Sequence, residues 1–198
     1  GGGFLQSFEV AVGVQVKQPS GLRLAQEEPL SLDEQWIPLG LSTSGKVEAE
    51  MVFVGYGITA KEHGYDDYEG IDVKDKIVLV LRYEPPPKDS NSPFKKYPDY
   101  SFHSALRTKA NNARDHGAAA MILVDLHNPD SQQLLSTRTS LWRGGRSLVA
   151  AQVKRAVIEK QLTNRGVSLA ALKENIDRNE TPASMTLGVS AALEVDPS

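Results

Sequence analysis

Two short, unbroken apolar runs separated by a helical pattern constrain the fold of this chain more than any other feature. Residues 76–81 (Lys-Ile-Val-Leu-Val-Leu) and 118–124 each have the length and composition of a strand that is buried on both faces. Between them, residues 104–116 carry apolar side chains at helical spacing, and Gly117 follows as a C-terminal stop signal. A strand, a helix and a second strand in this order predict a right-handed crossover that joins parallel strands.

Further elements are predicted on both sides of this unit. Residues 47–55 have a Val-rich centre typical of a strand, and residues 147–151 indicate a shorter one. A helix is expected over residues 153–162, and Ser168 is suited to cap the N-terminus of a last helix. The predicted fold class is α/β, with a partly parallel sheet and flanking helices.

Both ends of the chain alternate apolar with polar or small residues at a period of two. Residues 4–16 and 184–195 show this pattern, which is typical of a strand with one buried face. We interpret the two segments as an antiparallel two-strand ribbon, with the rest of the chain inserted between them.

The composition argues against several functional classes. The net charge of -3 leaves no basic excess to neutralise phosphates, so a nucleic-acid partner is not expected. The chain has no cysteine, which excludes disulfides and cysteine-ligated zinc. No apolar run reaches the roughly 18 residues that a membrane-spanning helix needs.

The sequence contains no complete catalytic motif. None of the four histidines stands in a His-Glu-x-x-His pattern, and no Gly-x-Ser-x-Gly motif is present. Residues 40–46 have the spacing of a phosphate-binding loop, but Val47 stands where Ser or Thr should bind magnesium, and a strand follows instead of a helix. We therefore expect no catalytic residue and no bound zinc in this chain.

An acidic cluster lies in residues 64–72 (Gly-Tyr-Asp-Asp-Tyr-Glu-Gly-Ile-Asp). Its members are Asp66, Asp67, Glu69 and Asp72, and clustered carboxylates are ligands for a hard cation such as calcium. Their spacing does not fit a calcium-binding loop. The favoured interpretation is a turn whose Asp side chains accept hydrogen bonds from nearby backbone amides, and a cation site is the weaker alternative.

The strongest resemblance to a known family lies in residues 48–81. The segment Met-Val-Phe-Val-Gly-Tyr-Gly-Ile, followed by Gly-Tyr-Asp-Asp-Tyr-Glu-Gly-Ile-Asp, resembles the protease-associated (PA) domain inserted in secreted zinc aminopeptidases. These enzymes form the family of leucyl aminopeptidase, glutamate carboxypeptidase and the transferrin receptor. Residues 109–124 and 166–169 resemble later elements of the domain, so the likeness covers residues 40–180. One departure from the family pattern is Ser147, since the family often has a proline before the strand predicted here over residues 147–151.

The resemblance implies a non-catalytic accessory domain that shapes substrate access or makes protein contacts in a zinc aminopeptidase. Residues 21–182 are then the PA domain, and residues 1–20 and 183–198 are strand stubs of the catalytic peptidase domain. That catalytic domain is the expected partner in the same chain, and it holds the zinc. The resemblance also implies an extracytoplasmic, secreted or periplasmic, location. An exposed apolar face on the terminal ribbon predicts a homodimer through these strands. The alternative is a free-standing module that binds a peptide, a glycan or a cation.

Two long irregular segments, 83–101 and 128–146, are predicted to leave the same carboxyl edge of the sheet. Ligands of open α/β sheets bind outside this edge, and loops of this length are uncommon unless they are functional or disordered. A mobile, solvated loop pair is the alternative. The residues predicted to contact a peptide substrate or a partner are the aromatic and arginine side chains Phe94, Tyr97, Tyr100, Arg138, Trp142, Arg143 and Arg146.

Overall fold

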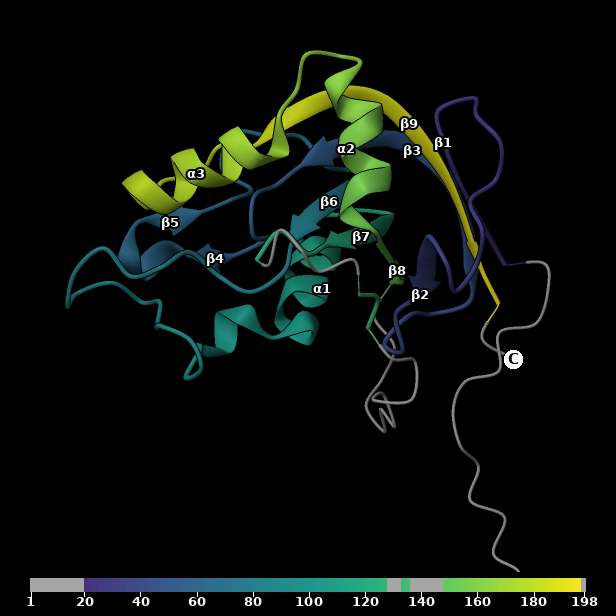
Figure 1. Ribbon diagram of the computed structural model, residues 1–198. Coiled ribbons are helices and arrows are strands. Elements are labelled where there is room, and N and C mark those ends of the chain that lie inside the picture. The colour runs from purple at the N-terminus through teal and green to yellow at the C-terminus, as the bar shows by residue number, and fades with distance from the viewer. Residues whose placement is uncertain (1–19, 128–132, 136–147, 197–198) are drawn as a thin grey trace, which may run out of the picture.

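The computed structural model describes residues 20–127, 133–135 and 148–196. They form a mixed α/β fold with a seven-stranded sheet, helices on both faces of it, and a separate two-stranded sheet (Figure 1). The strands are β1 (Gly21–Leu24), β2 (Trp36–Pro38), β3 (Gly45–Phe53), β4 (Thr59–Ala60), β5 (Tyr65–Asp66), β6 (Ile77–Leu81), β7 (Ala120–Val124), β8 (Val149–Val153) and β9 (Met185–Val195). The helices are α1 (Leu106–Asp115), α2 (Arg155–Thr163) and α3 (Leu169–Asn179), with 3-10 turns η1 (Lys61–His63) and η2 (Phe102–Ser104).

The strand order in the large sheet is β1-β9-β3-β6-β7-β8-β2. Its centre is parallel, since β3, β6, β7 and β8 run in one direction, and β9, β1 and β2 add antiparallel pairs toward the edges. Ile77 lies opposite Ala120 and Leu81 opposite Val124, which confirms the predicted parallel crossover from β6 through α1 to β7.

Helices cover the parallel strands on both sides. Figure 1 shows α2 and α3 on one face and α1 on the other. Ile77 and Leu79 pack in a core with Ile158 of α2 and Ile176 of α3, and Val78 packs on the opposite face. All residues of β6, β7 and β8 are therefore buried, which explains their unbroken apolar runs. Each fully buried aliphatic side chain stabilises the folded state by about 1.5–3 kcal/mol relative to the same side chain exposed to water.

The C-terminal strand β9 belongs to this sheet, and its predicted pairing with residues 4–16 stays a prediction. It pairs with β3 along its length and with β1 near its end, while residues 4–16 lie outside the described residues. Leu187 and Val189, expected on an exposed face, are only 3% and 4% exposed and pack in the main core. The prediction of exposed apolar residues on this strand is wrong because the domain's own helices cover that face. The division at residues 20 and 183 stays a prediction.

A local irregularity allows β9 to curve. The register between β3 and β9 shifts between Glu50 and Val52, opposite Gly188, whose φ is +63°. A Cβ at Gly188 would meet nothing within 4 Å, so the left-handed backbone and not crowding favours glycine there. Bulges of this kind bend a strand and increase its twist.

Candidate functional site

The carboxyl ends of β6 and β7 meet at one edge of the sheet, as the sequence predicted. Arg82 and Asp125 are the first residues after these strands, and Arg82 Nη1 donates to Asp125 Oδ2 at 2.8 Å. The side chains are 26% and 13% exposed, so water screens this ion pair less than a fully exposed one. The pair ties together the two points where the chain leaves the sheet.

Four rings gather beside this ion pair, and we call them the aromatic edge: Tyr83, Tyr97, Tyr100 and His127. Tyr83 stacks on Tyr100 with ring centroids 4.8 Å apart, and the His127 ring lies edge-on at 5.0 Å from Tyr83. Tyr97 contacts Tyr100 and His127 at centroid distances of 6.0 and 6.1 Å. The cluster therefore joins residues from the ends of both strands and from the loop after β6.

Tyr83 enters this cluster through an unusual backbone conformation. Its φ is +68°, in the left-handed region that costs a residue with a Cβ about 1–2 kcal/mol. The Arg82 guanidinium lies 4.6 Å from the centroid of the Tyr83 ring, a cation–π distance. These contacts hold Tyr83 in the position where it stacks on Tyr100.

A buried carboxylate closes the loop between Tyr83 and Tyr100. Glu84 is 5% exposed and accepts hydrogen bonds from the backbone N–H of Lys95 at 3.0 Å and of Ser101 at 2.7 Å. The Ser101 hydroxyl also donates to Glu84. Because both chain ends of the loop are fixed to one carboxylate, the loop has a defined path and presents Tyr97 to solvent at 71% exposure.

The structure separates the predicted contact residues into three groups. Tyr97 and Tyr100 come together in the aromatic edge. Phe94 is 3% exposed and packs edge-on against Tyr65 at 5.0 Å, so its prediction as a surface contact is wrong: it anchors the loop in the core. The remaining four lie outside the described residues and stay predictions: Arg138, Trp142, Arg143 and Arg146.

Tyr83 and His127 were not among the contact residues predicted from the sequence. Both lie within three residues of the end of a parallel strand, Leu81 and Val124 respectively. Polar and aromatic residues at this position meet at the same edge of a sheet, and that signal was available in the sequence.

The aromatic edge is suited to contacts and not to covalent chemistry. Burial, and then the neighbouring Tyr83, raises the pKa of Tyr100, so its hydroxyl stays protonated near neutral pH. Tyrosine combines a large apolar ring with a hydroxyl that donates and accepts hydrogen bonds, and such residues are enriched at binding interfaces.

A buried polar cluster lies beneath the loop. Asp67 is fully buried and accepts from the Ile58 N–H and from the Tyr65 hydroxyl, each at 3.0 Å. Lys109 is also fully buried, and its Nζ donates to the carbonyl of Tyr56. Burial raises the pKa of Asp67 to about 7 and lowers the pKa of Lys109 to about 7.

The Gly-Tyr-Gly and Asp-Asp motifs quoted above meet in this cluster. Gly55 has a φ of +50°, and a Cβ there would lie 2.5 Å from Asp67 Oδ1. The predicted turn is confirmed, because Asp66 Oδ1 accepts from the Tyr68 N–H at 3.1 Å and Asp72 Oδ1 from the Lys74 N–H at 3.0 Å. The motif residues therefore fold one segment onto the other.

The acidic residues predicted as a cation site point in different directions. Asp67 faces the interior, Asp66 is buried in the turn, and Glu69 and Asp72 are exposed. Within the described ranges, no three His, Asp or Glu residues are grouped so that they could hold a metal ion.

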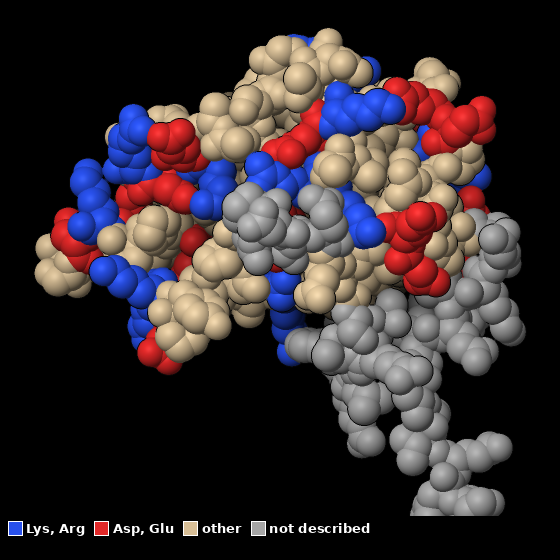
Figure 2. All heavy atoms as spheres, viewed as in Figure 1, with Lys and Arg blue, Asp and Glu red and all other residues tan. Residues whose placement is uncertain are grey.

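Charges of both signs lie side by side on the face of the domain that Figure 2 shows. Figure 2 shows Lys and Arg interspersed with Asp and Glu, and the described residues on this face form no large patch of one sign. No helix in the described part of the chain is long and apolar enough to cross a membrane.

Comparisons with known proteins agree with the motif and the fold. A family profile for the PA domain matches residues 43–160, and the chain belongs to this family. An aminopeptidase from Aneurinibacillus sp. strain AM-1 superimposes with a TM-score of 0.51 at 19% identity, covering 92% of this chain and 32% of the other. BSAP, a zinc aminopeptidase from Bacillus subtilis, gives a TM-score of 0.50 at 14% identity, covering 93% and 31%. No curated protein matched the sequence.

The family match shows the family, and the structural similarities show the fold. The chain spans about a third of the length of the two aminopeptidase structures. The family match identifies this chain as a PA domain, and its fold is similar to part of these two aminopeptidase structures.

Proposed function

We propose that this chain is the non-catalytic accessory domain of a zinc aminopeptidase, and that its aromatic edge contacts the peptide substrate. The observation that carries the proposal is Tyr97, which is 71% exposed on a loop that a buried carboxylate fixes in place. The chain spans about a third of the length of the aminopeptidases that it resembles, and this supports the proposal that the zinc ligands and the catalysis belong to the rest of such a protein. We also propose an extracytoplasmic location for the whole protein.

An ordered, exposed tyrosine suits this role energetically. Contacts made by mobile side chains lose conformational entropy on binding, about 0.5–1.5 kcal/mol for each side chain that becomes fixed. The Tyr97 ring already rests against Tyr100 and His127, so part of that loss occurs when the domain folds. Under this proposal, a long peptide reaches the aromatic edge and a dipeptide held at the catalytic zinc does not.

The test compares long and short substrates in the peptidase that carries this domain. We expect Tyr97→Ala to lower kcat/KM several-fold for peptides of about ten residues and to leave dipeptide hydrolysis unchanged. Phe102→Ala is the matched control, because Phe102 is also exposed, at 69%, and lies outside the aromatic edge. Equal losses for both substrate lengths, or the same effect from Phe102→Ala, would contradict the proposal.

The non-catalytic part of the proposal has its own test. The 198-residue chain is expected to hydrolyse no aminoacyl-nitroanilide, with or without added zinc. Its metal content after dialysis should be far below one zinc per chain. Turnover that persists through a second purification would overturn this part and would leave the contact proposal to its own test.

A further inference from the structure

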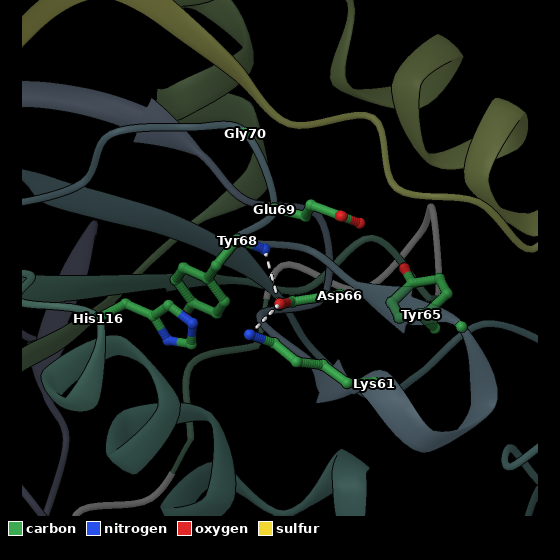
Figure 3. A pocket seen from close by; sticks show the side chains of 8 residues that line it. Lys61, Tyr65, Asp66, Tyr68, Glu69, Gly70 and His116 are labelled. Carbon is green, nitrogen blue, oxygen red and sulfur yellow. Dashed lines mark hydrogen bonds and ion pairs between the residues drawn. The ribbon is translucent and has the colours of Figure 1, made fainter.

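A separate pocket opens beside the β4–β5 hairpin. Its volume is about 500 Å³, within the size range of small-ligand sites. Side chains from the hairpin, the turn after it and the end of α1 line it: Lys61, Tyr65, Asp66, Tyr68, Glu69 and His116 (Figure 3). None of them belongs to the aromatic edge, so this site is distinct from the one proposed above.

One wall of the pocket contains the buried carboxylate of Asp66, which forms an ion pair with the exposed Lys61. Asp66 is 5% exposed, and its Oδ1 is satisfied by the Tyr68 N–H and the Thr59 hydroxyl, both at 3.1 Å. Asp66 Oδ2 lies 3.4 Å from Lys61 Nζ, and the Lys61 side chain is 71% exposed. Because Asp66 is buried, its carboxylate needs a cation beside it. The Lys61 ammonium belongs to an exposed side chain, so another cation can take its place while the carboxylate stays paired.

The opposite wall is flat and aromatic. The Tyr68 and His116 rings stack with centroids 4.2 Å apart and an interplanar angle of 11°. His116 Nδ1 lies 2.8 Å from the Asn112 carbonyl oxygen, which accepts, and this contact fixes the orientation of the ring. Figure 3 shows Asp66 between these rings and Tyr65, with Lys61 extended toward its carboxylate.

We propose that this pocket binds an arginine side chain of a polypeptide, and that Lys61 is a displaceable substitute for it. A guanidinium is planar, stacks on aromatic faces and donates up to five hydrogen bonds, which matches stacked rings beside a carboxylate acceptor. With Lys61 displaced, the charges at the site are those of Asp66 and Glu69, and an incoming cation replaces the ammonium that left. A lysine side chain offers the charge but neither the planarity nor the paired donors.

The experiment titrates the 198-residue chain with blocked tripeptides and follows backbone amide signals by NMR. The probe is acetyl-Gly-Arg-Gly-amide, and the matched ligand has citrulline, which keeps the planar shape without the charge. We expect saturable shifts at the amides of Asp66, Tyr68 and His116 with the arginine peptide, and none with the citrulline peptide. Asp66→Asn, which keeps an oxygen for the Tyr68 N–H, should weaken binding at least about ten-fold.

The decisive variant is Lys61→Met, which removes the competing ammonium from an exposed position. Binding of the arginine peptide should become about two- to five-fold tighter. Lys46→Met is the control, because the Lys46 side chain is as exposed as that of Lys61 and pairs with Glu194 at 3.3 Å in another part of the domain. Weaker or unchanged binding in Lys61→Met, equal binding of citrulline, tighter binding of a lysine peptide, or no saturation would each overturn the proposal.

Discussion

The buried polar cluster and the aromatic edge use similar side chains in opposite ways. In the cluster, Tyr65 donates its hydroxyl to Asp67, and Asp67 satisfies a backbone amide of the preceding segment. In the edge, the tyrosines pack against one another, and Tyr97 is left 71% exposed. Hydrogen-bonded polar groups in a low-dielectric interior fix how segments fold together, whereas rings on an ordered loop remain available for contacts.

The two regions are physically connected. Phe94 of the loop packs against Tyr65 of the polar cluster, and Glu84 at the base of the loop accepts from both Lys95 and Ser101. The domain therefore builds an exposed surface on top of a rigid polar core. Changes in the core are expected to alter stability, and changes in the edge to alter binding.

The largest effect on stability should come from Asp67→Ala. The substitution leaves the Ile58 N–H and the Tyr65 hydroxyl without their acceptor and removes the stronger of two negative charges that act on the buried Lys109. We expect a loss of about 3–5 kcal/mol in the free energy of unfolding. Urea denaturation measures it, and Asp72→Ala, at an exposed turn position, should lose less than about 1 kcal/mol. Equal losses would show that the buried cluster contributes no more than a surface turn.

A pair of glycine substitutions separates crowding from backbone strain. Gly55 and Gly64 both have positive φ, +50° and +72°, but a Cβ at Gly55 would lie 2.5 Å from Asp67 Oδ1, while one at Gly64 meets nothing within 4 Å. Gly64→Ala should therefore cost only about 1 kcal/mol, and Gly55→Ala about 2–3 kcal/mol. Thermal unfolding of the two variants tests this, and a larger loss in Gly64→Ala would contradict it.

The pH dependence of stability should carry the signature of the buried carboxyl. Its folded pKa of about 7 exceeds its ordinary value, so between these values the folded state of Asp67 holds a proton that the unfolded state has lost. Stability from this group falls as pH rises. Between about pH 5 and 6.5 the free energy of unfolding of the parent should fall by roughly 2 kcal/mol relative to that of Asp67→Asn, at about 1.4 kcal/mol per pH unit.

Lys109 should give the opposite slope at higher pH. Its folded pKa is lowered to about 7, so above this pH the unfolded state holds the extra proton and stability rises with pH. Lys109→Met should remove this rise. Urea denaturation across the pH range measures both slopes. If the free energy of unfolding of the parent changes with pH in parallel with that of both variants, the buried charges are not the cause of its pH dependence.

The smallest effect on stability should come from the exposed tyrosine of the edge. Tyr97→Ala is expected to change the free energy of unfolding by less than about 0.5 kcal/mol, as is usual for surface positions. Tyr100→Ala should lose about 1 kcal/mol, because it removes the ring that stacks on Tyr83. Chemical denaturation distinguishes the two, and a large loss in Tyr97→Ala would show that this ring serves the fold.

The sequence by itself determined the features that depend on local periodicity. The apolar runs of β6 and β7 and the helical spacing of α1 specified the crossover, because burial on both faces leaves no polar position in a strand. Ser168 was recognisable as an N-cap, and its hydroxyl accepts from the Ala171 N–H at 3.2 Å. The family motif was also visible, since Gly55 and Asp67 are chemically distinctive residues.

Tertiary structure decided which partner covers each face. A period of two shows that β9 has one buried face, but it does not show that α2 and α3 cover it. The strands β1 and β2 were missed because their four and three residues are too short for a periodic signal. The burial of Phe94 and the approach of His127 to Tyr83 depend on contacts between distant segments, and no local pattern encodes such contacts.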